Sequence, residues 1–122
     1  MEEGEYLSRG AQVKHISTNY KGERALDLRR GLTKVLEAVT DLIELEELQL
    51  SGNYMKELPP SRNKIKDLKR LKLFLNQLRE LPSCICELSN LAVLSVSNNQ
   101  LSVLPSNIKH LKKLQNLYLS DN

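Results

Sequence analysis

Residues 68–82 read LKRLKLFLNQLRELP, and the stretches on either side have the same arrangement: residues 45–59 read LEELQLSGNYMKELP and residues 91–105 read LAVLSVSNNQLSVLP. The common pattern is L-x-x-L-x-L-x-x-N-x-L followed by Leu-Pro, and it recurs every 23 residues. A fourth copy begins at Leu114 and continues to Asn122. Only two fixed positions hold another residue, Met55 and Val96. Because such agreement over successive units indicates a structural repeat, we interpret the chain as an array of 23-residue units.

The composition favours a repeat over other leucine-rich structures. The chain has 25 leucines in 122 residues, no Trp, one Phe and a net charge of +3. A coiled coil does not fit, because the leucines do not recur every 3.5 residues across the Asn, Gly and Pro positions. A membrane span does not fit, because the longest uncharged stretch, residues 88–108, contains five serines and several amides. The start, MEEGEY, lacks the positive charge and apolar run of a secretory signal.

Each unit divides into a strand, a turn and a return segment. In x-L-x-L-x the leucines alternate with other residues, as in a half-buried strand, and we expect the strands of successive units to stack in parallel. An asparagine follows each strand, where its side chain can satisfy backbone groups of the turn. Proline then begins the return segment, which we expect to be a short helix or 3₁₀ turn. The asparagines are Asn53, Asn76, Asn99 and Asn122, and the prolines are Pro59, Pro82 and Pro105.

A weaker copy precedes these units in residues 25–39, ALDLRRGLTKVLEAV. It is one residue short, with Gly31 in place of the asparagine and Leu36 in place of the proline. We therefore predict a repeat array over residues 25–122 and a polar N-terminal segment over residues 1–24, which is partly disordered or caps the array. Within that segment VKHIS, residues 13–17, is a candidate for an extra half-strand.

The array stops at Asn122, in mid-repeat and directly after its strand. Terminal repeats usually need a cap, because their core side is otherwise exposed, and the last strand is an open edge. We therefore expect about 4.5 repeats without a C-terminal cap. Two readings are open: the chain is a fragment of a longer array, or it self-associates through its C-terminal edge.

The form L-x-x-L-P-x-x-I, seen in residues 78–85 and 101–108, resembles the intracellular leucine-rich repeats of the Ras-suppressor and Ras-scaffold class. The resemblance covers residues 25–122 and implies an α/β solenoid, a horseshoe arc with one parallel strand per repeat on the concave face and short helical or 3₁₀ segments on the convex face. It also implies a cytoplasmic adaptor or scaffold in signal transduction that binds proteins through the concave sheet. Arg62 departs from the pattern, because it replaces the isoleucine, and its charge must reach solvent.

The residues that alternate with the strand leucines form the predicted binding surface. From them we select as candidate protein-binding residues Gln49, Arg70, Lys72, Phe74, Ser95 and Tyr118. Phe74 has Ser51 and Ser97 as its expected neighbours, which leave its ring uncovered. It is either an interface anchor, as aromatic residues often are, or it packs over Leu75 or the next strand. Glu47 lies beside Arg70 in the expected register, and we predict a weak ion pair between them.

Charged residues cluster by segment, with one acidic and two basic groups. The acidic group is Glu44, Glu46, Glu47 and Glu57, and the basic groups are Lys64, Lys66, Lys69, Arg70, Lys72 and Arg79, followed by Lys109, His110, Lys112 and Lys113. A solvated face explains most of them. The alternative is a protein partner with an acidic surface, such as a small GTPase, a kinase or a phosphatase. The weak net charge does not indicate nucleic acid.

No set of residues suited to catalysis or cofactor binding is visible in the sequence. His15 and His110 have no nucleophile or metal ligand at a useful spacing, and glycine-rich phosphate motifs are absent. Cys84 and Cys86 are too close for an unstrained disulfide and too few for a zinc site, so we expect reduced thiols in an intracellular chain. The sequence predicts a protein-interaction module that is not an enzyme and needs no cofactor or metal. A structural or assembly role is the alternative, and a receptor ectodomain is disfavoured by the missing signal and cysteine caps.

Overall fold

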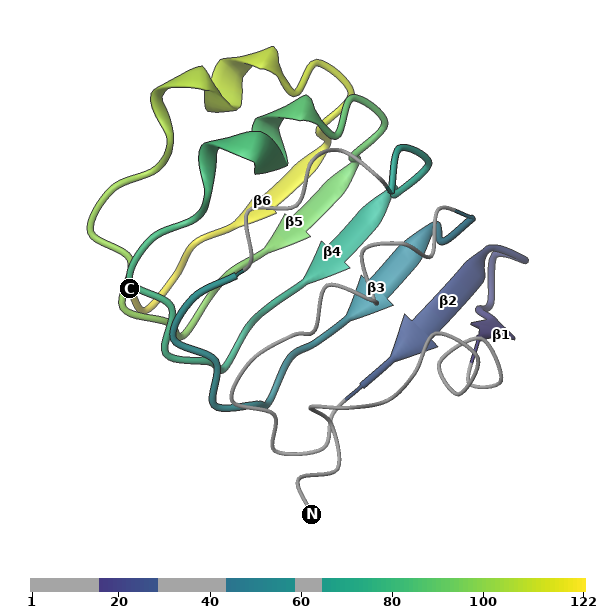
Figure 1. Ribbon diagram of the computed structural model, residues 1–122, viewed down its shortest axis with the longest axis horizontal. Helices are drawn as coiled ribbons and strands as arrows, with labels where there is room; N and C mark the ends of the chain where they lie inside the picture. The colour runs from purple at the N-terminus through teal and green to yellow at the C-terminus, as the bar shows by residue number, and fades with distance from the viewer. Residues whose placement is uncertain (1–15, 29–43, 59–64) are drawn as a thin grey trace.

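The computed structural model describes residues 16–28, 44–58 and 65–122. In these residues it has one six-stranded sheet, whose strands lie side by side in chain order, and two 3₁₀ helices stacked beside the sheet (Figure 1). The elements are β1 (Ser17–Thr18), β2 (Arg24–Asp27), β3 (Glu47–Gln49), β4 (Arg70–Lys72), η1 (Ser83–Glu87), β5 (Val93–Ser95), η2 (Ser106–His110) and β6 (Asn116–Tyr118).

The register of the sheet follows the 23-residue period. Leu48 of β3 lies opposite Leu71 of β4, which lies opposite Leu94 of β5. The strands from β2 to β6 are parallel, as the repeat predicts. The backbone pairing also continues beyond the ends of the strands, since the Leu50 amide donates to the Lys72 carbonyl at 2.8 Å and the Leu73 amide donates to the Ser95 carbonyl at 2.7 Å. Equivalent positions of successive units therefore lie in rows across the sheet.

The first strand differs from the others in direction. β1 is antiparallel to β2, with Ser17 opposite Ala25 and Thr18 opposite Arg24. Of the half-strand proposed for residues 13–17, only Ser17 belongs to β1, which continues to Thr18, and residues 13–15 lie outside the described residues. Ile16 packs against the core, so this short segment joins the first unit through both backbone and side-chain contacts.

Leucines of successive strands form the core, as predicted. Three buried rows cross the sheet, one from each leucine position of the repeat: Leu45, Leu68 and Leu91; Leu48, Leu71 and Leu94; Leu50, Leu73 and Val96. Ile85 and Cys86 of η1 belong to the same cluster. Burial declines at the last strand, where Leu117 is 36% exposed and Leu119 is 37% exposed.

The turn asparagines bind the backbone from inside the molecule. The Asn76 side-chain amide donates to the Leu73 carbonyl of its own unit at 3.1 Å and to the Leu50 carbonyl of the preceding unit at 3.0 Å. Its oxygen accepts from the Met55 amide at 3.1 Å. Asn99 repeats all three bonds one unit later. Since each asparagine joins two units, the column fixes the spacing of the turns, which confirms its predicted structural role.

The residue before each of these asparagines has a left-handed backbone. The φ angles are 73° at Gly52, 58° at Leu75, 56° at Asn98 and 58° at Asp121. Glycine, asparagine and aspartate adopt this conformation readily, whereas a leucine does so only at a steric cost. Leu75 is therefore the exception in the column.

Proline begins the two described return segments that contain a 3₁₀ helix. Pro82 precedes η1 with φ −65°, and Pro105 precedes η2 with φ −56°. Each of the two segments forms one short 3₁₀ helix, as the sequence predicts. The fixed φ of proline favours a turn, and its missing amide loses no bond there. Pro59, Arg62 and the weaker copy beyond Leu28 lie outside the described residues.

Candidate protein-binding surface

The strand residues that alternate with the core leucines form one surface, which we call the outer face of the sheet. Its central row is Asp27, Gln49, Lys72, Ser95 and Tyr118, one residue from each parallel strand in register. The row before it contains Glu47, Arg70, Val93 and Asn116. The row after it, beyond the ends of the strands, contains Ser51, Phe74, Ser97 and Ser120. This is the surface that the sequence predicts as the concave face.

Arg70 and Lys72 are already paired with carboxylates of the same chain. Arg70 Nε lies 2.9 Å from Glu23 Oε1, and Lys72 Nζ lies 3.4 Å from Glu47 Oε2. The predicted pair of Glu47 with Arg70 is therefore wrong, although the two residues are opposite each other in register. The reason is that Glu23, which lies outside the repeat pattern, takes the Arg70 guanidinium and leaves Glu47 to Lys72 and to the Asn19 amide at 2.7 Å.

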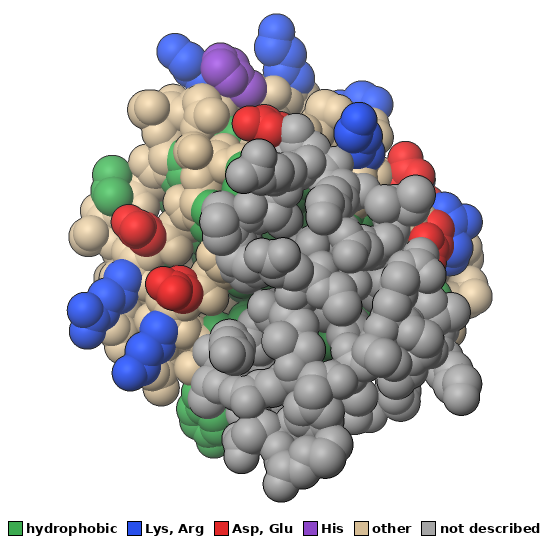
Figure 2. Space-filling model, in the orientation of Figure 1, with side chains coloured by type: hydrophobic (Ala, Val, Ile, Leu, Met, Phe, Trp, Pro, Cys, Tyr) green, Lys and Arg blue, Asp and Glu red, His purple; other side chains and the backbone are tan. Residues whose placement is uncertain are grey.

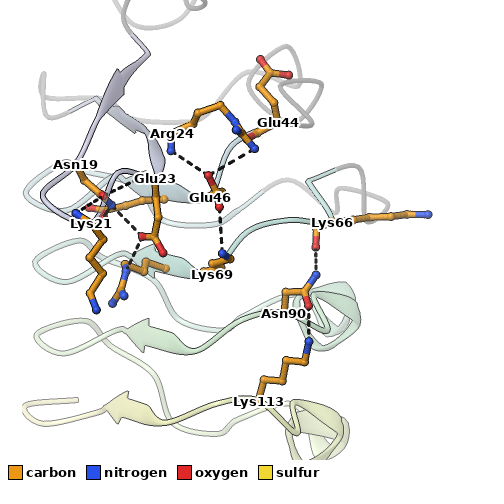
Figure 3. Close-up of polar contacts among 12 residues, drawn as sticks. Asn19, Lys21, Glu23, Arg24, Glu44, Glu46, Lys66, Lys69, Asn90 and Lys113 are labelled. Carbon is orange, nitrogen blue, oxygen red and sulfur yellow. Dashed lines mark hydrogen bonds and ion pairs between the residues drawn. The ribbon is translucent and has the colours of Figure 1, made fainter.

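A second polar network follows the amino-terminal ends of the strands (Figure 3). Glu46 accepts from the Arg24 amide at 3.1 Å and lies 3.1 Å from Lys69 Nζ. Further along, Asn90 donates to the Lys66 carbonyl at 3.0 Å and accepts from Lys113 Nζ at 2.8 Å. These contacts join neighbouring units, so we assign them a structural role.

Two of these carboxylates are held in their charged form. The hydrogen bond from Asn19 and the contact with Arg70 lower the pKa of Glu23, although its burial acts in the opposite direction. The Arg24 amide and the Lys69 ammonium lower the pKa of Glu46. Both carboxylates are consequently charged at neutral pH, and the basic side chains that face them are neutralised.

The other candidate residues differ in how much surface they offer. Tyr118 is exposed, whereas Ser95 and Phe74 are partly buried. Gln49 is buried, and its side-chain oxygen accepts from the Ser51 amide at 2.8 Å. Tyr118, Ser95 and Phe74 are therefore accessible on this face to different degrees, whereas little of Gln49 is.

Leu75 is an exposed apolar residue that the selection from sequence did not include. It is 54% exposed and directly follows Phe74. A comparison of the four units could have singled it out, because leucine stands here where the other units have the turn residues Gly52, Asn98 and Asp121. Beside Phe74 in the same row, the buried Ser51 hydroxyl has no hydrogen-bond partner among the described residues.

The basic residues near the end of the chain lie apart from the sheet. Lys109 and His110 form the last turn of η2, and Lys112 and Lys113 follow in the next turn, all four exposed. Figure 2 shows the histidine beside Lys or Arg side chains at one end of the molecule. Cys84 and Cys86 lie in η1 and are not in a disulfide, and burial raises the pKa of Cys86, which keeps that thiol protonated.

Two features, a metal-binding cluster and a membrane-spanning helix, are not found in the described part of the chain. Its residues include no group of three or more His, Cys, Asp or Glu side chains placed to hold a metal ion. They also include no helix with the length and apolar character needed to cross a membrane.

Comparisons with known proteins assign the family. The model of leucine-rich repeat regions matches residues 7–122. The chain belongs to the leucine-rich-repeat family. A solved leucine-rich-repeat protein of Leptospira interrogans is similar, with 39% identity and a TM-score of 0.71 over 75% of this chain and 25% of that one. This leucine-rich-repeat chain thus spans a quarter of the length of that structure, and a search of curated proteins found no match.

The family assignment fits the stacked units and their parallel sheet, which make this leucine-rich-repeat chain a solenoid. Leucine-rich repeats typically serve as non-enzymatic modules that bind proteins, for which solenoids provide an extended surface.

Proposed function

We propose that this leucine-rich-repeat chain is a non-catalytic interaction module that binds a protein partner on the outer face of its sheet. The supporting observation is the arrangement along the strands: the leucines are buried in the core, and the residues between them lie in register on the outer face, where Lys72 and Ser95 are partly exposed and Tyr118 is exposed. Because the asparagine column ties the turns together, the surface is rigid before binding. A rigid surface loses little conformational entropy when a partner docks.

The finer parts of the proposal concern class, place and architecture. We propose a cytoplasmic adaptor or scaffold of signal transduction, of the 23-residue L-x-x-L-P-x-x-I type, whose partner is a small GTPase, a kinase or a phosphatase. We also propose that its units number about 4.5 over residues 25–122 and that residues 1–24 are a polar segment distinct from the array. The antiparallel direction of β1 supports that division, because every later strand pair is parallel.

The ion pairs bear on the chemistry of the partner. An acidic partner at Arg70 or Lys72 has to compete with Glu23 or Glu47, which already lie within ion-pair distance. An acidic surface is better accommodated by the exposed Lys109, Lys112 and Lys113 near η2. We therefore propose that the sheet itself binds through its uncharged residues.

Affinity capture with two matched variants tests whether the outer face binds a protein. Ser95→Arg places a long charged side chain in the middle of the sheet, and Ser102→Arg makes the same change at an exposed position beyond it. We expect Ser95→Arg to lose the proteins that the wild type captures from a cytosolic extract, and Ser102→Arg to keep them. The same set of captured proteins with both variants contradicts the proposed surface.

Self-association through the last strand is the second candidate. The partial exposure of Leu117 and Leu119 favours it, because apolar side chains beside an unpaired strand edge can pair with another chain. Light scattering over a dilution series provides the test. A mass that stays that of a monomer at all concentrations excludes this role.

A further inference from the structure

The conformation of Leu75 has no explanation in the packing of the fold. Its φ of 58° belongs to a backbone region that leucine rarely adopts. Gly52, Asn98 and Asp121 meet the same requirement in the other units with residues suited to it. Strained positions of this kind persist where the structure around them holds them in place, and they cluster at binding sites.

Burial does not compensate for the strain. Leu75 is 54% exposed and is not part of the core cluster. A leucine that is strained and exposed at once contributes little to folding, since the apolar surface it leaves in water gains nothing from the hydrophobic effect. A role outside the fold accounts for both properties.

Leu75 and Phe74 form one rigid apolar element at the carboxyl end of β4, which we call the Phe74–Leu75 pair. The Leu75 amide donates to the Ser97 carbonyl at 3.1 Å, and the Phe74 carbonyl accepts from the Gly52 amide at 3.0 Å. These bonds fix the pair to the units on both sides. The backbone that carries the two side chains is thus held in position before a partner arrives, as suits an interface anchor.

The outer face next to the pair is uncharged over β5 and β6, and among the positions equivalent to Leu75 the charged one is Asp121, two units away. The outer-face residues of β5 and β6, together with those that follow these strands, are Val93, Ser95, Ser97, Asn116, Tyr118 and Ser120. Tyr, Ser and Asn are the residues that antibody loops use to contact proteins, because they combine aromatic area with adaptable hydrogen bonds. On the other side of the pair, Lys72 and Glu47 neutralise each other. A partner segment without charges complements this surface, whereas a charged one leaves its charge poorly solvated and unpaired.

We propose that the Phe74–Leu75 pair anchors an extended, uncharged segment of a partner protein, with an aliphatic or aromatic side chain of that segment packed on the pair. This inference rests on the proposed function and adds to it the anchor and the chemistry of the partner. Ser95, Ser97 and Tyr118 provide the hydrogen bonds along the rest of the segment.

An array of synthetic random-sequence peptides, probed with the labelled chain, tests the proposal. We expect the retained peptides to be rich in aliphatic and aromatic residues and poor in Asp, Glu, Lys and Arg. Leu75→Asn places a residue that suits the left-handed backbone and removes the apolar side chain. It should therefore raise the melting temperature of the chain, and yet lower its affinity for the retained peptides about tenfold or more. Val103→Asn makes the same kind of change at another exposed apolar position and should leave binding unchanged.

The outcomes separate this inference from the proposed function. Preferential retention of acidic or basic peptides, undiminished binding by Leu75→Asn, or an array from which the wild type retains nothing overturns the inference. If Ser95→Arg abolishes binding and Leu75→Asn does not, the outer face binds proteins without this anchor, and only the inference fails. If neither variant changes the binding of the retained peptides, the inference and the proposed function both fail.

Discussion

A single asparagine side chain in each unit supplies several hydrogen bonds that the backbone of the turn cannot make by itself. The turn leaves the Leu50 and Leu73 carbonyls and the Met55 amide without backbone partners inside the molecule, and Asn76 bonds all three. Buried polar groups without partners are costly, so an amide at this position, with both a donor and an acceptor, stabilises two adjacent units at once.

Replacement of Asn76 by alanine should therefore be among the most destabilising changes in the chain. The substitution removes three hydrogen bonds and leaves the Met55 amide without a partner, while the Leu50 carbonyl keeps its bond from Asn53 and the Leu73 carbonyl keeps its bond from Asn99. At roughly 1 kcal/mol for each lost bond we expect a loss of about 3 kcal/mol in the free energy of unfolding. Urea unfolding measures it. Asn116→Ala removes the same side chain from an exposed position of β6 and should change stability by less than about 0.5 kcal/mol. Equal effects of the two substitutions are incompatible with the role assigned to Asn76.

At the scale of elements, the turn before β2 is fastened to a strand two places away in the sheet. Glu23 follows the turn that begins at Asn19, and its carboxylate binds Arg70 of β4 at 2.9 Å. The Asn19 amide binds both Glu23, at 3.0 Å, and Glu47 of β3, at 2.7 Å. This turn is thus attached to two successive strands, β3 and β4, by charged and amide side chains, in addition to the β1–β2 backbone pairing.

The attachment of this turn makes stability depend on pH in a definite direction. Because the pKa of Glu23 is lowered from its ordinary value of 4.5, its contribution is complete above that value and is lost as the pH falls through the lowered one. Glu23→Gln should be less stable than the wild type at pH 7, and the difference should shrink as the pH falls below about 4. Urea midpoints measured at a series of pH values provide the test.

Asn19→Ala provides the control for this pH dependence. It keeps the Glu23 carboxylate and removes the hydrogen bond that lowers its pKa most, so the acid loss of stability should be smaller and should be complete at a higher pH than in the wild type. A difference between wild type and Glu23→Gln that stays constant from pH 7 to the acid limit contradicts the assignment.

The elements show which parts of the structure a repeat pattern can predict. The parallel strands, the leucine rows, the asparagine column and the proline-initiated 3₁₀ helices follow from spacing alone, because equivalent positions of successive units are adjacent in space. The spacing did not predict the ion-pair partner of Arg70, because Glu23 lies before the first parallel strand and outside the 23-residue period. The burial of Gln49 and the strain of Leu75 also depend on neighbours and backbone angles, which alternation alone does not specify.

At the scale of the whole molecule, the same residue position is packed to different degrees along the array. Leu94 of β5 is fully buried, whereas Leu117, which is opposite it in β6, is 36% exposed. In a solenoid each unit contacts only its neighbours, so stability is close to a sum of units and of the interfaces between them. The cost of one substitution should therefore vary with the number of neighbouring units that cover the site.

Leu94→Ala and Leu117→Ala measure that variation. Leu94→Ala leaves a cavity between two covering units and should cost about 2–5 kcal/mol, whereas Leu117→Ala should cost less than half as much, since the side chain is already partly in water and the space it leaves opens to solvent. Urea unfolding at low protein concentration compares the two. Equal costs are the contrary result, because they require Leu117 to be covered in solution. If that equality appears only at high protein concentration, the cover is a second copy of the chain, and self-association through β6 gains its direct support.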